Sequence, residues 1–324
     1  MPSEANLTFI KTAYGGLDFV CGGGSVVFRA VQPDGEMVAV KCYRDVSQRR
    51  CEVYRALQHL DTGGYVTPTR FHAGGLTLLW EGGAERVDVA VTPWLEGLTL
   101  DRKVAELRAA GDEQGLRQLL DELESMAVWL LAQPWAHGDL KPDNIIATPH
   151  GLRLIDCDAA YVPGVATPRS EQGTEGYRHP RRDVECDNAH IDDFALAVLC
   201  LGVRALILDP ERKVESVFPW REGMWHRENE QWKELLRLSE QTGDARARRL
   251  CELLTCEWVE IEGLAHTLTR RRKIRSGATA FCRDGRWGVL NPDGEVAEPA
   301  LWDDIIQKDG RTWGVMTDQL SEID

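Results

Sequence analysis

Residues 137–144, with the sequence HGDLKPDN, bring three kinds of polar group into one short segment. Asp139 carries a carboxylate, Lys141 an ammonium group and Asn144 a carboxamide. Phosphoryl transfer needs these groups close together: the carboxylate orients the attacking hydroxyl and accepts its proton, the ammonium group neutralises charge on the phosphoryl group, and the amide oxygen binds magnesium. The segment therefore predicts phosphoryl-transfer chemistry, with Asp139, Lys141 and Asn144 as catalytic residues.

A second acidic residue follows where metal binding would require one. Residues 151–158, GLRLIDCD, read as a short apolar strand that ends in carboxylates. An aspartate at this place would emerge beside the phosphates of a nucleotide. Asp156 and Asn144 are therefore the predicted metal ligands.

Together, these two segments resemble the catalytic loop and metal-binding motif of the eukaryotic-like Ser/Thr protein kinases, in the bacterial variety with glycine, here Gly138, where most members carry arginine. The resemblance implies ATP as phosphoryl donor, Mg²⁺ as the metal with Mn²⁺ as a substitute, Asp139 as base and Lys141 as clamp on the γ-phosphate. It gives His137 a structural role. Because that arginine pairs with a phosphorylated segment in many members, we expect activity that does not require phosphorylation within residues 167–174.

The nucleotide anchor is predicted near the start of the chain. Residues 7–43 alternate apolar and polar positions and predict three antiparallel strands, the third of which, residues 37–43, carries Lys41 among apolar residues. A buried lysine needs a partner, and the resemblance implies that Lys41 binds the α and β phosphates and pairs with a helix glutamate. Glu52, on a helix predicted over residues 47–60, is the predicted partner, with a solvated surface glutamate as the alternative.

A glycine cluster lies between the first two predicted strands. Its free backbone N–H groups would cover phosphates, and it departs from the kinase pattern because a serine stands in place of the third glycine. An ordinary flexible hairpin is the alternative. The predicted nucleotide-binding residues here are Gly22, Gly23, Gly24 and Ser25.

Strands predicted over residues 76–80 and 87–92 lead into a segment that resembles the kinase hinge, whose backbone groups bond to adenine. Thr92 would lie at the back of the nucleotide pocket, and Trp94 and Leu95 would line it. For Trp94, a place in the core is the alternative interpretation.

Residues 173–180 resemble the end of a kinase activation segment, and Thr174 matches the threonine that contacts the catalytic aspartate and lysine. A glutamate usually follows the proline of this segment, but Arg181 stands there. The ion pair that anchors the segment in the family is therefore absent or replaced, with Asp183 or Glu185 as candidates.

Helical periodicity predicts helices over residues 100–110, 114–132, 194–208, 229–240 and 244–254. Asp192, just before the apolar helix at 194–208, matches the residue that braces the catalytic-loop backbone in the kinase family. An N-cap role is compatible with that assignment.

The end of the chain repeats itself. RDGRWGV at residues 283–289 recurs as KDGRTWGV at 308–315, and the pair resembles the WG repeat of bacterial proteins. Asp-Gly would form a hairpin turn, tryptophan would fill a small core, and glycine would allow close strand approach. Two repeats rarely stand alone, so they should pack on the preceding lobe or on another chain, and recognition of a partner protein through residues 277–324 is the alternative. The basic run at 270–275 is predicted to be a solvated linker.

Composition narrows the classes of function. The net charge of -14 disfavours generic binding to nucleic acid or to an anionic membrane. Nine cysteines without a zinc-binding spacing indicate a reducing cytoplasm, and we expect no signal peptide and no membrane span.

The sequence thus predicts an α+β, bilobal protein-kinase-like fold, with an antiparallel β lobe over residues 1–95, a helical lobe over 96–272 and an all-β extension over 277–324. The predicted function is an ATP- and magnesium-dependent Ser/Thr kinase acting on a protein substrate. Two alternatives stay open: a small-molecule phosphotransferase of the aminoglycoside or choline kind, and a pseudokinase scaffold that acts through ATP binding and the repeats.

Overall fold

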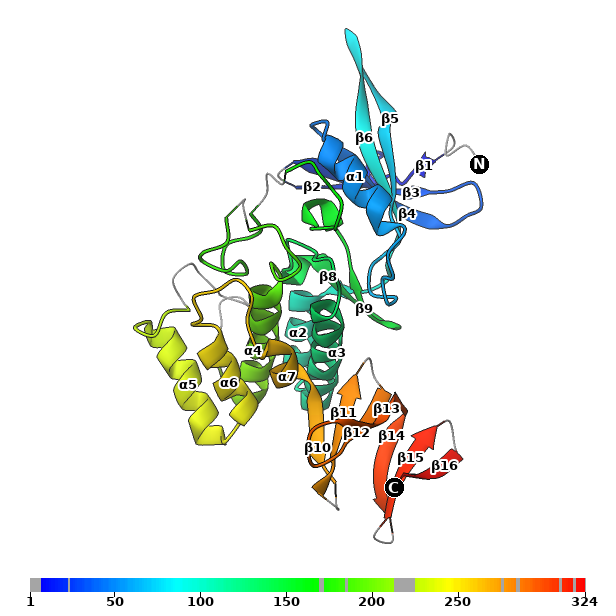
Figure 1. The fold of residues 1–324 in the computed structure, drawn as a ribbon. Helices are drawn as coiled ribbons and strands as arrows, with labels where there is room; N and C mark the ends of the chain where they lie inside the picture. Colours follow the sequence, from blue (N-terminus) through cyan, green and yellow to red (C-terminus); the bar gives the residue numbers. More distant parts are fainter. Residues whose placement is uncertain are drawn as a thin grey trace.

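The computed structural model describes residues 7–22, 24–168, 172–183, 186–212, 225–274, 277–283, 286–308, 311–316 and 319–323. The chain is mixed α+β, as predicted. A curled antiparallel sheet comes first, a group of helices follows, and small antiparallel sheets end the chain (Figure 1). The described residues form seven α-helices.

The first sheet is built from β1 (Thr8–Phe9), β2 (Phe19–Cys21), β3 (Ser25–Val31), β4 (Met37–Tyr43), β5 (Arg70–Trp80) and β6 (Gly83–Pro93). Its order is β1-β3-β4-β6-β5, with β2 also paired to β3 and all pairs antiparallel. Alternate residues of β4 point to opposite faces. Val38, Val40 and Cys42 enter one apolar cluster, which leaves Lys41 and Tyr43 on the other face.

Helix α1 (Gln48–Leu57) follows β4 directly. Its N-cap Ser47 accepts a hydrogen bond from the N–H of Arg50 at 3.3 Å, which satisfies a free donor of the first turn. Tyr54 stacks on Phe71 of β5, with ring centroids 5.7 Å apart. The helix therefore packs against the same end of the sheet that carries Lys41.

The helical part contains α2 (Leu100–Ala109), α3 (Glu113–Leu131), α4 (Asp193–Leu208), α5 (Glu230–Thr242), α6 (Ala245–Leu253) and α7 (Leu264–Leu268). The predicted helices are present within a few residues of their expected ends. Helix α3 buries one apolar stripe, and α4 is buried almost all round, so both belong to the largest core cluster. None of the helices formed by the described residues is long and apolar enough to cross a membrane.

Between α3 and α4 lie the elements that hold the polar residues of interest. Strands β8 (Ile145–Thr148) and β9 (Gly151–Leu154) form a hairpin that pairs with β7 (Leu98–Thr99). A 3₁₀ turn, η1 (Pro142–Asn144), precedes the hairpin, and a second, η2 (Cys157–Ala159), follows it.

The C-terminal part has one sheet of β10 (Arg270–Lys273), β11 (Thr279–Arg283), β12 (Arg286–Leu290) and β13 (Val296–Trp302), and another of β14 (Asp304–Lys308), β15 (Arg311–Met316) and β16 (Gln319–Ile323). The prediction of a solvated linker at 270–275 is wrong for its first four residues, because β10 pairs with β11 along its whole length. Strands β10 and β11 contact α3.

The two tryptophan-glycine pairs lie at matching places in these sheets. Gly288 faces Phe281 across the β11–β12 pair, and Gly314 faces Ile305 across the β14–β15 pair. A Cβ atom on Gly314 would collide with the ring of Trp302, so this glycine allows the last tryptophan of the first repeat to lie against the second. The predicted turn residues Asp284, Gly285, Asp309 and Gly310 lie outside the described residues.

Candidate active site

Asp139 is held by three groups, two of them from its own loop. Its Oδ2 atom accepts a hydrogen bond from the Lys141 ammonium at 2.8 Å, and its Oδ1 atom accepts from the N–H and the hydroxyl of Thr174 at 2.8 and 2.7 Å. The Asn144 amide donates to the backbone carbonyl of Asp139 at 2.8 Å. The predicted contacts of Thr174 with Asp139 and Lys141 are thus present.

These contacts determine the charge of Asp139. Burial favours the neutral acid, but the hydrogen bonds from Lys141 and Thr174 and the lysine charge outweigh it, so the pKa of Asp139 lies below its usual value. Asp139 is therefore a carboxylate at neutral pH, as a proton acceptor must be.

Asp192 fixes the backbone that leads into this loop. Its carboxylate accepts hydrogen bonds from the N–H groups of His137 and, at 2.9 Å, Gly138. Its side chain makes no capping hydrogen bond to α4, so of the two compatible roles the loop contact is the one observed. His137 is fully buried; the N–H of Asp139 lies 3.3 Å from its Nδ1, and its Nε2 donates to the Ile155 carbonyl at 2.8 Å.

Gly138 has a φ of +85°, in the left-handed region, and a Cβ atom there would collide with the Ala159 carbonyl. The Gly138 carbonyl accepts a 2.6 Å hydrogen bond from Arg182, a buried residue that the sequence analysis did not single out. Arg182 also donates to the Ile191 carbonyl at 3.3 Å. This guanidinium links residues 182 and 191 to the loop that carries Asp139.

Of the two residues predicted to replace the ion pair expected after residue 180, Asp183 and Glu185, the structure describes only Asp183. Arg181 pairs with Glu257 at 3.5 Å, and both side chains are exposed. Asp183 accepts a hydrogen bond from the N–H of Cys186 at 3.0 Å, and Glu185 lies outside the described residues.

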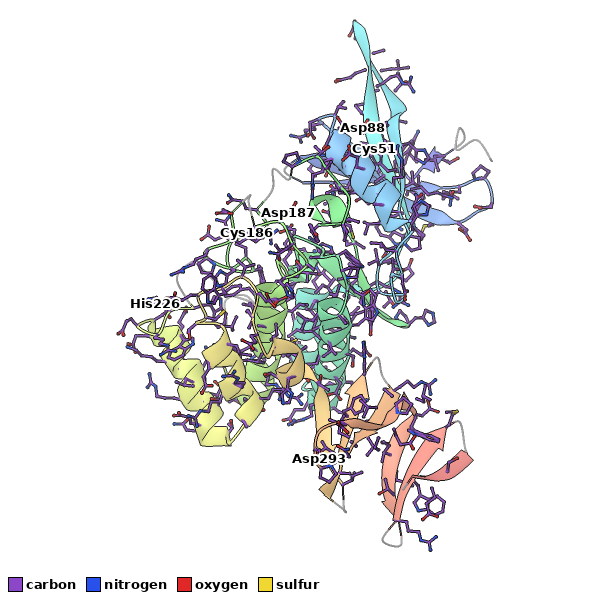
Figure 2. The ribbon with its side chains drawn as sticks, viewed as in Figure 1. Cys51, Asp88, Cys186, Asp187, His226 and Asp293 are labelled. Atoms are coloured by element: carbon purple, nitrogen blue, oxygen red, sulfur yellow. The ribbon has the colours of Figure 1, made fainter. Side chains whose placement is uncertain are left out.

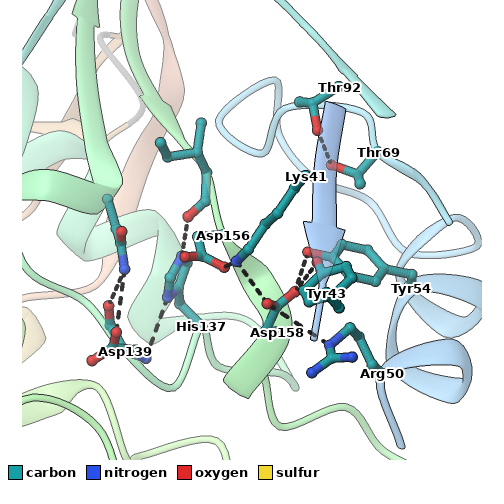
Figure 3. A network of polar contacts seen from close by, with 12 residues as sticks. Lys41, Tyr43, Arg50, Tyr54, Thr69, Thr92, His137, Asp139, Asp156 and Asp158 are labelled. Atoms are coloured by element: carbon teal, nitrogen blue, oxygen red, sulfur yellow. Dashed lines mark hydrogen bonds and ion pairs between the residues drawn. The ribbon is translucent and has the colours of Figure 1, made fainter. Parts of the chain in front are cut away.

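Lys41 lies between two carboxylates that come from the segment after β9 (Figure 3). Its ammonium pairs with Asp156 and, at 2.7 Å, with Asp158. Burial alone would lower the pKa of Lys41, but the two negative charges outweigh burial and raise it. Lys41 is therefore charged.

Asp158 has further partners from two other elements (Figure 3). The hydroxyls of Tyr43 in β4 and Tyr54 in α1 donate to its Oδ1 atom at 2.7 and 2.6 Å. Arg50 of α1 lies 3.9 Å from Oδ2 and stacks over the Tyr43 ring. From the sequence, Asp158 was visible only as one of the carboxylates at the end of a predicted strand. The alternation of Lys41 and Tyr43 along one face of β4 was the signal for part of this arrangement.

The prediction that Glu52 pairs with Lys41 is wrong in this structure. The Glu52 carboxylate accepts hydrogen bonds from Gln48 at 2.8 Å and from the Thr167 hydroxyl at 2.9 Å. The reason is helical register: Arg50 and Tyr54 face Asp158, and a residue two positions from each is rotated by about 200° around the helix. Arg49, a buried residue of the same helix, donates to the Thr167 carbonyl and pairs with Asp187 at 3.6 Å. Asp187 lies on the segment that faces α1 (Figure 2).

The predicted glycine loop joins β2 to β3. The N–H of Gly22 donates to the Ser25 carbonyl at 2.9 Å, and the Gly24 carbonyl accepts from the N–H of Arg44 at 3.1 Å. Space around Gly24 is open, and Gly23 lies outside the described residues. Because Ser25 pairs with Tyr43 and Val27 with Lys41, the loop lies at the end of β3 nearest Lys41.

The predicted hinge follows β6. Thr92 shares a 3.3 Å hydrogen bond with Thr69, and the N–H of Trp94 donates to the Met37 carbonyl at 2.9 Å. Arg29 stacks over the Trp94 ring at 4.6 Å, on a half-buried surface. Among the described residues, the N–H of Leu95 has no hydrogen-bond partner.

Two groups of residues belong to one site, because hydrogen bonds join the segments that carry them. The Asp139 cluster comprises Asp139, Lys141, Asn144 and Thr174, and the Lys41 cluster comprises Lys41, Tyr43, Tyr54, Asp156 and Asp158. The N–H of Ile155 donates to the Asn144 carbonyl at 3.1 Å, and the Ile155 carbonyl accepts from His137. Asp156 follows directly and has a φ of +65°, so the chain turns sharply at this aspartate.

The donor set fits a hard divalent cation. Such ions prefer oxygen ligands, and the Asp156 side chain is 37% exposed. The amide nitrogen of Asn144 is used toward Asp139, which leaves its amide oxygen for a metal. The residues present therefore fit Mg²⁺ or Mn²⁺ bound with the phosphates of a nucleotide.

No known protein-family model matches this chain, and a search of curated proteins found no similar sequence.

Proposed function

We propose that this protein is an ATP-dependent protein Ser/Thr kinase. The observation that carries the proposal is the arrangement around Asp139: one carboxylate that receives hydrogen bonds from Lys141 and Thr174, next to Asn144 and joined through Ile155 to Asp156 and Lys41. These are the charges that phosphoryl transfer needs.

Each residue has a distinct part in the proposed reaction. Asp139 accepts the proton of a Ser or Thr hydroxyl, whose oxygen forms a bond to the γ-phosphorus while the bond to the leaving ADP oxygen breaks. Lys141 stabilises negative charge on the transferred group, and Lys41 binds the other phosphates. Bound Mg²⁺ at Asn144 and Asp156 would add charge neutralisation.

The contact between Thr174 and Asp139 favours a protein substrate over a small molecule. It attaches a segment more than thirty residues further along the chain directly to the proposed base. A segment held there presents its backbone next to the reacting group, where an extended peptide can align.

The packing of β10 and β11 on α3 supports a structural role for the C-terminal sheets.

The test is incubation with labelled ATP and Mg²⁺, with autophosphorylation and transfer to a generic protein as readouts. Asp139→Asn should lower both rates by about 100-fold or more, since general-base catalysis contributes at least that much. Asp143→Asn is the matched control: Asp143 lies in the same turn but is exposed, and its variant should keep the wild-type rate.

Two outcomes would contradict the proposal. Turnover of aminoglycosides or polyols without any protein phosphorylation would indicate a small-molecule phosphotransferase. A wild-type protein that binds ATP but transfers nothing, and an Asp139→Asn variant that keeps full biological activity, would indicate a scaffold.

A further inference from the structure

The partner of Lys41 comes from an unexpected element. Neither carboxylate that holds the lysine belongs to α1; both lie on the turn after β9, at positions 156 and 158. Glu52 is occupied on another face of its helix. Whatever orients Lys41 must therefore come from Asp156, Asp158 or both.

The two carboxylates differ in how firmly they are held. Asp158 is 13% exposed and receives two tyrosine hydroxyls on one oxygen and Lys41 on the other. Asp156 is 37% exposed and, among the described residues, has Lys41 as its one hydrogen-bond donor. Asp158 is thus fixed by β4, α1 and the turn itself, whereas Asp156 is open on one side.

This difference suits two separate tasks. An open carboxylate can bind a metal ion, but a cation there competes with the Lys41 ammonium for the same oxygens. A second carboxylate that is fully hydrogen-bonded and turned away from solvent keeps the lysine in place when the first is occupied. We propose that Asp158 is the positioning residue for Lys41, held by Tyr43 and Tyr54, and that it leaves Asp156 for the metal. The inference rests on the proposed function, because it concerns the binding of a nucleotide.

The two tyrosines make this arrangement part of the fold. Tyr43 lies two residues after Lys41 on the same strand face, and Tyr54 reaches the same Asp158 oxygen from α1. Both rings pack near Phe71, with centroid distances of 6.1 and 5.7 Å. The position of α1 is thereby connected to Lys41 through Asp158, which receives the Tyr54 hydroxyl and has Arg50 at 3.9 Å, rather than through a helix glutamate.

The experiment measures equilibrium binding of a fluorescent ATP analogue, with and without Mg²⁺, and the ATP dependence of autophosphorylation. Asp158→Asn should weaken binding about tenfold or more and should lower kcat/KM for ATP mainly through KM, because Lys41 would bind the phosphates in the ground state as well. Asp158→Glu should restore part of the affinity. The double variant Tyr43→Phe, Tyr54→Phe should lie between wild type and Asp158→Asn.

Glu52→Gln is the control that separates this assignment from the one expected from sequence. It should leave affinity and KM within about twofold of wild type, since Glu52 does not contact Lys41. Melting temperatures of all variants identify any loss of fold, and the reactivity of Lys41 toward an amine-selective acylating probe gives a readout without nucleotide. Loss of the Asp158 charge should increase that reactivity, because the ammonium would lose one of its two carboxylate partners and would be held less firmly.

Opposite results would overturn the inference. If Glu52→Gln loses tenfold in affinity while Asp158→Asn matches wild type, the glutamate is the anchor. If wild type binds and uses ATP but Asp158→Asn changes neither affinity nor Lys41 acylation, Asp158 does not position the lysine. A wild-type protein that neither binds nor consumes ATP overturns the proposed function itself, which is a separate result.

Discussion

The Asp139 and Lys41 clusters lie in one site but are assembled in different ways. Around Asp139, Lys141 and Asn144 are two and five residues away, and Thr174 is the one distant contact. Around Lys41, the partners Asp156 and Asp158 are 115 and 117 residues away. The first cluster is largely built by one turn of the chain, and the second exists only where strand, helix and turn meet.

This difference explains why the residues of the Asp139 cluster could be predicted from the sequence, whereas the partners of Lys41 could not. A turn such as η1 fixes the spacing of neighbouring side chains locally, so their relative positions follow from the sequence itself. A carboxylate that must reach Lys41 can come from any neighbouring element. Here it comes from Asp158, and Tyr43 and Tyr54 supply the remaining hydrogen bonds.

The largest effect is expected at Gly138, where the two clusters touch. Gly138→Ala would force a side chain into the left-handed region and against the Ala159 carbonyl, one residue after Asp158. We expect a loss of about 3 kcal/mol or more in the free energy of unfolding, from backbone strain and overpacking together. Urea denaturation measures it.

Gly164→Ala is the matched control for that variant. Gly164 has the same φ of +85°, but no heavy atom lies within 4 Å of the position of its Cβ. Its cost should be only the backbone term, about 1–2 kcal/mol. Equal losses for the two variants would mean that the contact with Ala159 does not matter.

A smaller effect that separates the clusters is expected from Asp192→Ala. This buried carboxylate accepts the N–H groups of His137 and Gly138, which would both be left without a partner. We expect a loss of about 2 kcal/mol or more in the free energy of unfolding, from about 1 kcal/mol or more for each of the two unsatisfied donors. The turnover number should fall while ATP affinity stays within about twofold, because Asp192 does not contact Lys41. An equal fall in ATP affinity would show that the two clusters are not separable.

The smallest effect is a difference in acid sensitivity. Because the pKa of Asp139 is lowered in the folded state, the unfolded chain binds its proton first as the pH falls. The stability from this group is therefore fully present above about pH 4 and is lost as the pH falls through the folded pKa. Wild type should lose stability more steeply than Asp139→Asn as the pH falls below about 4. Parallel curves would show that Asp139 carries no such shift.

Much of the fold could be predicted because its elements have long, regular patterns. The stripe of α3 and the alternation in β4 indicate their elements without reference to the rest of the chain. The basic run at 270–275 was misjudged for the opposite reason. Four cationic residues have the composition of a linker, and they form β10 only because β11 offers its edge.

In the candidate site, the sequence by itself determined the residues whose spacing along the chain is also their spacing in space. Asp139 and Lys141 directly precede the turn η1 and Asn144 ends it, so local contacts bring the three residues together. The prediction of phosphoryl-transfer chemistry rests on those residue types and their spacing.

Only the tertiary structure decided what Lys41 meets. The register of α1 turned Glu52 away, the left-handed conformation at Asp156 redirected the chain, and packing brought Tyr43, Tyr54 and Asp158 to one point. The physical reason is that a buried charge must be compensated by whatever group packing places near it, and the identity of that group depends on contacts more than a hundred residues apart.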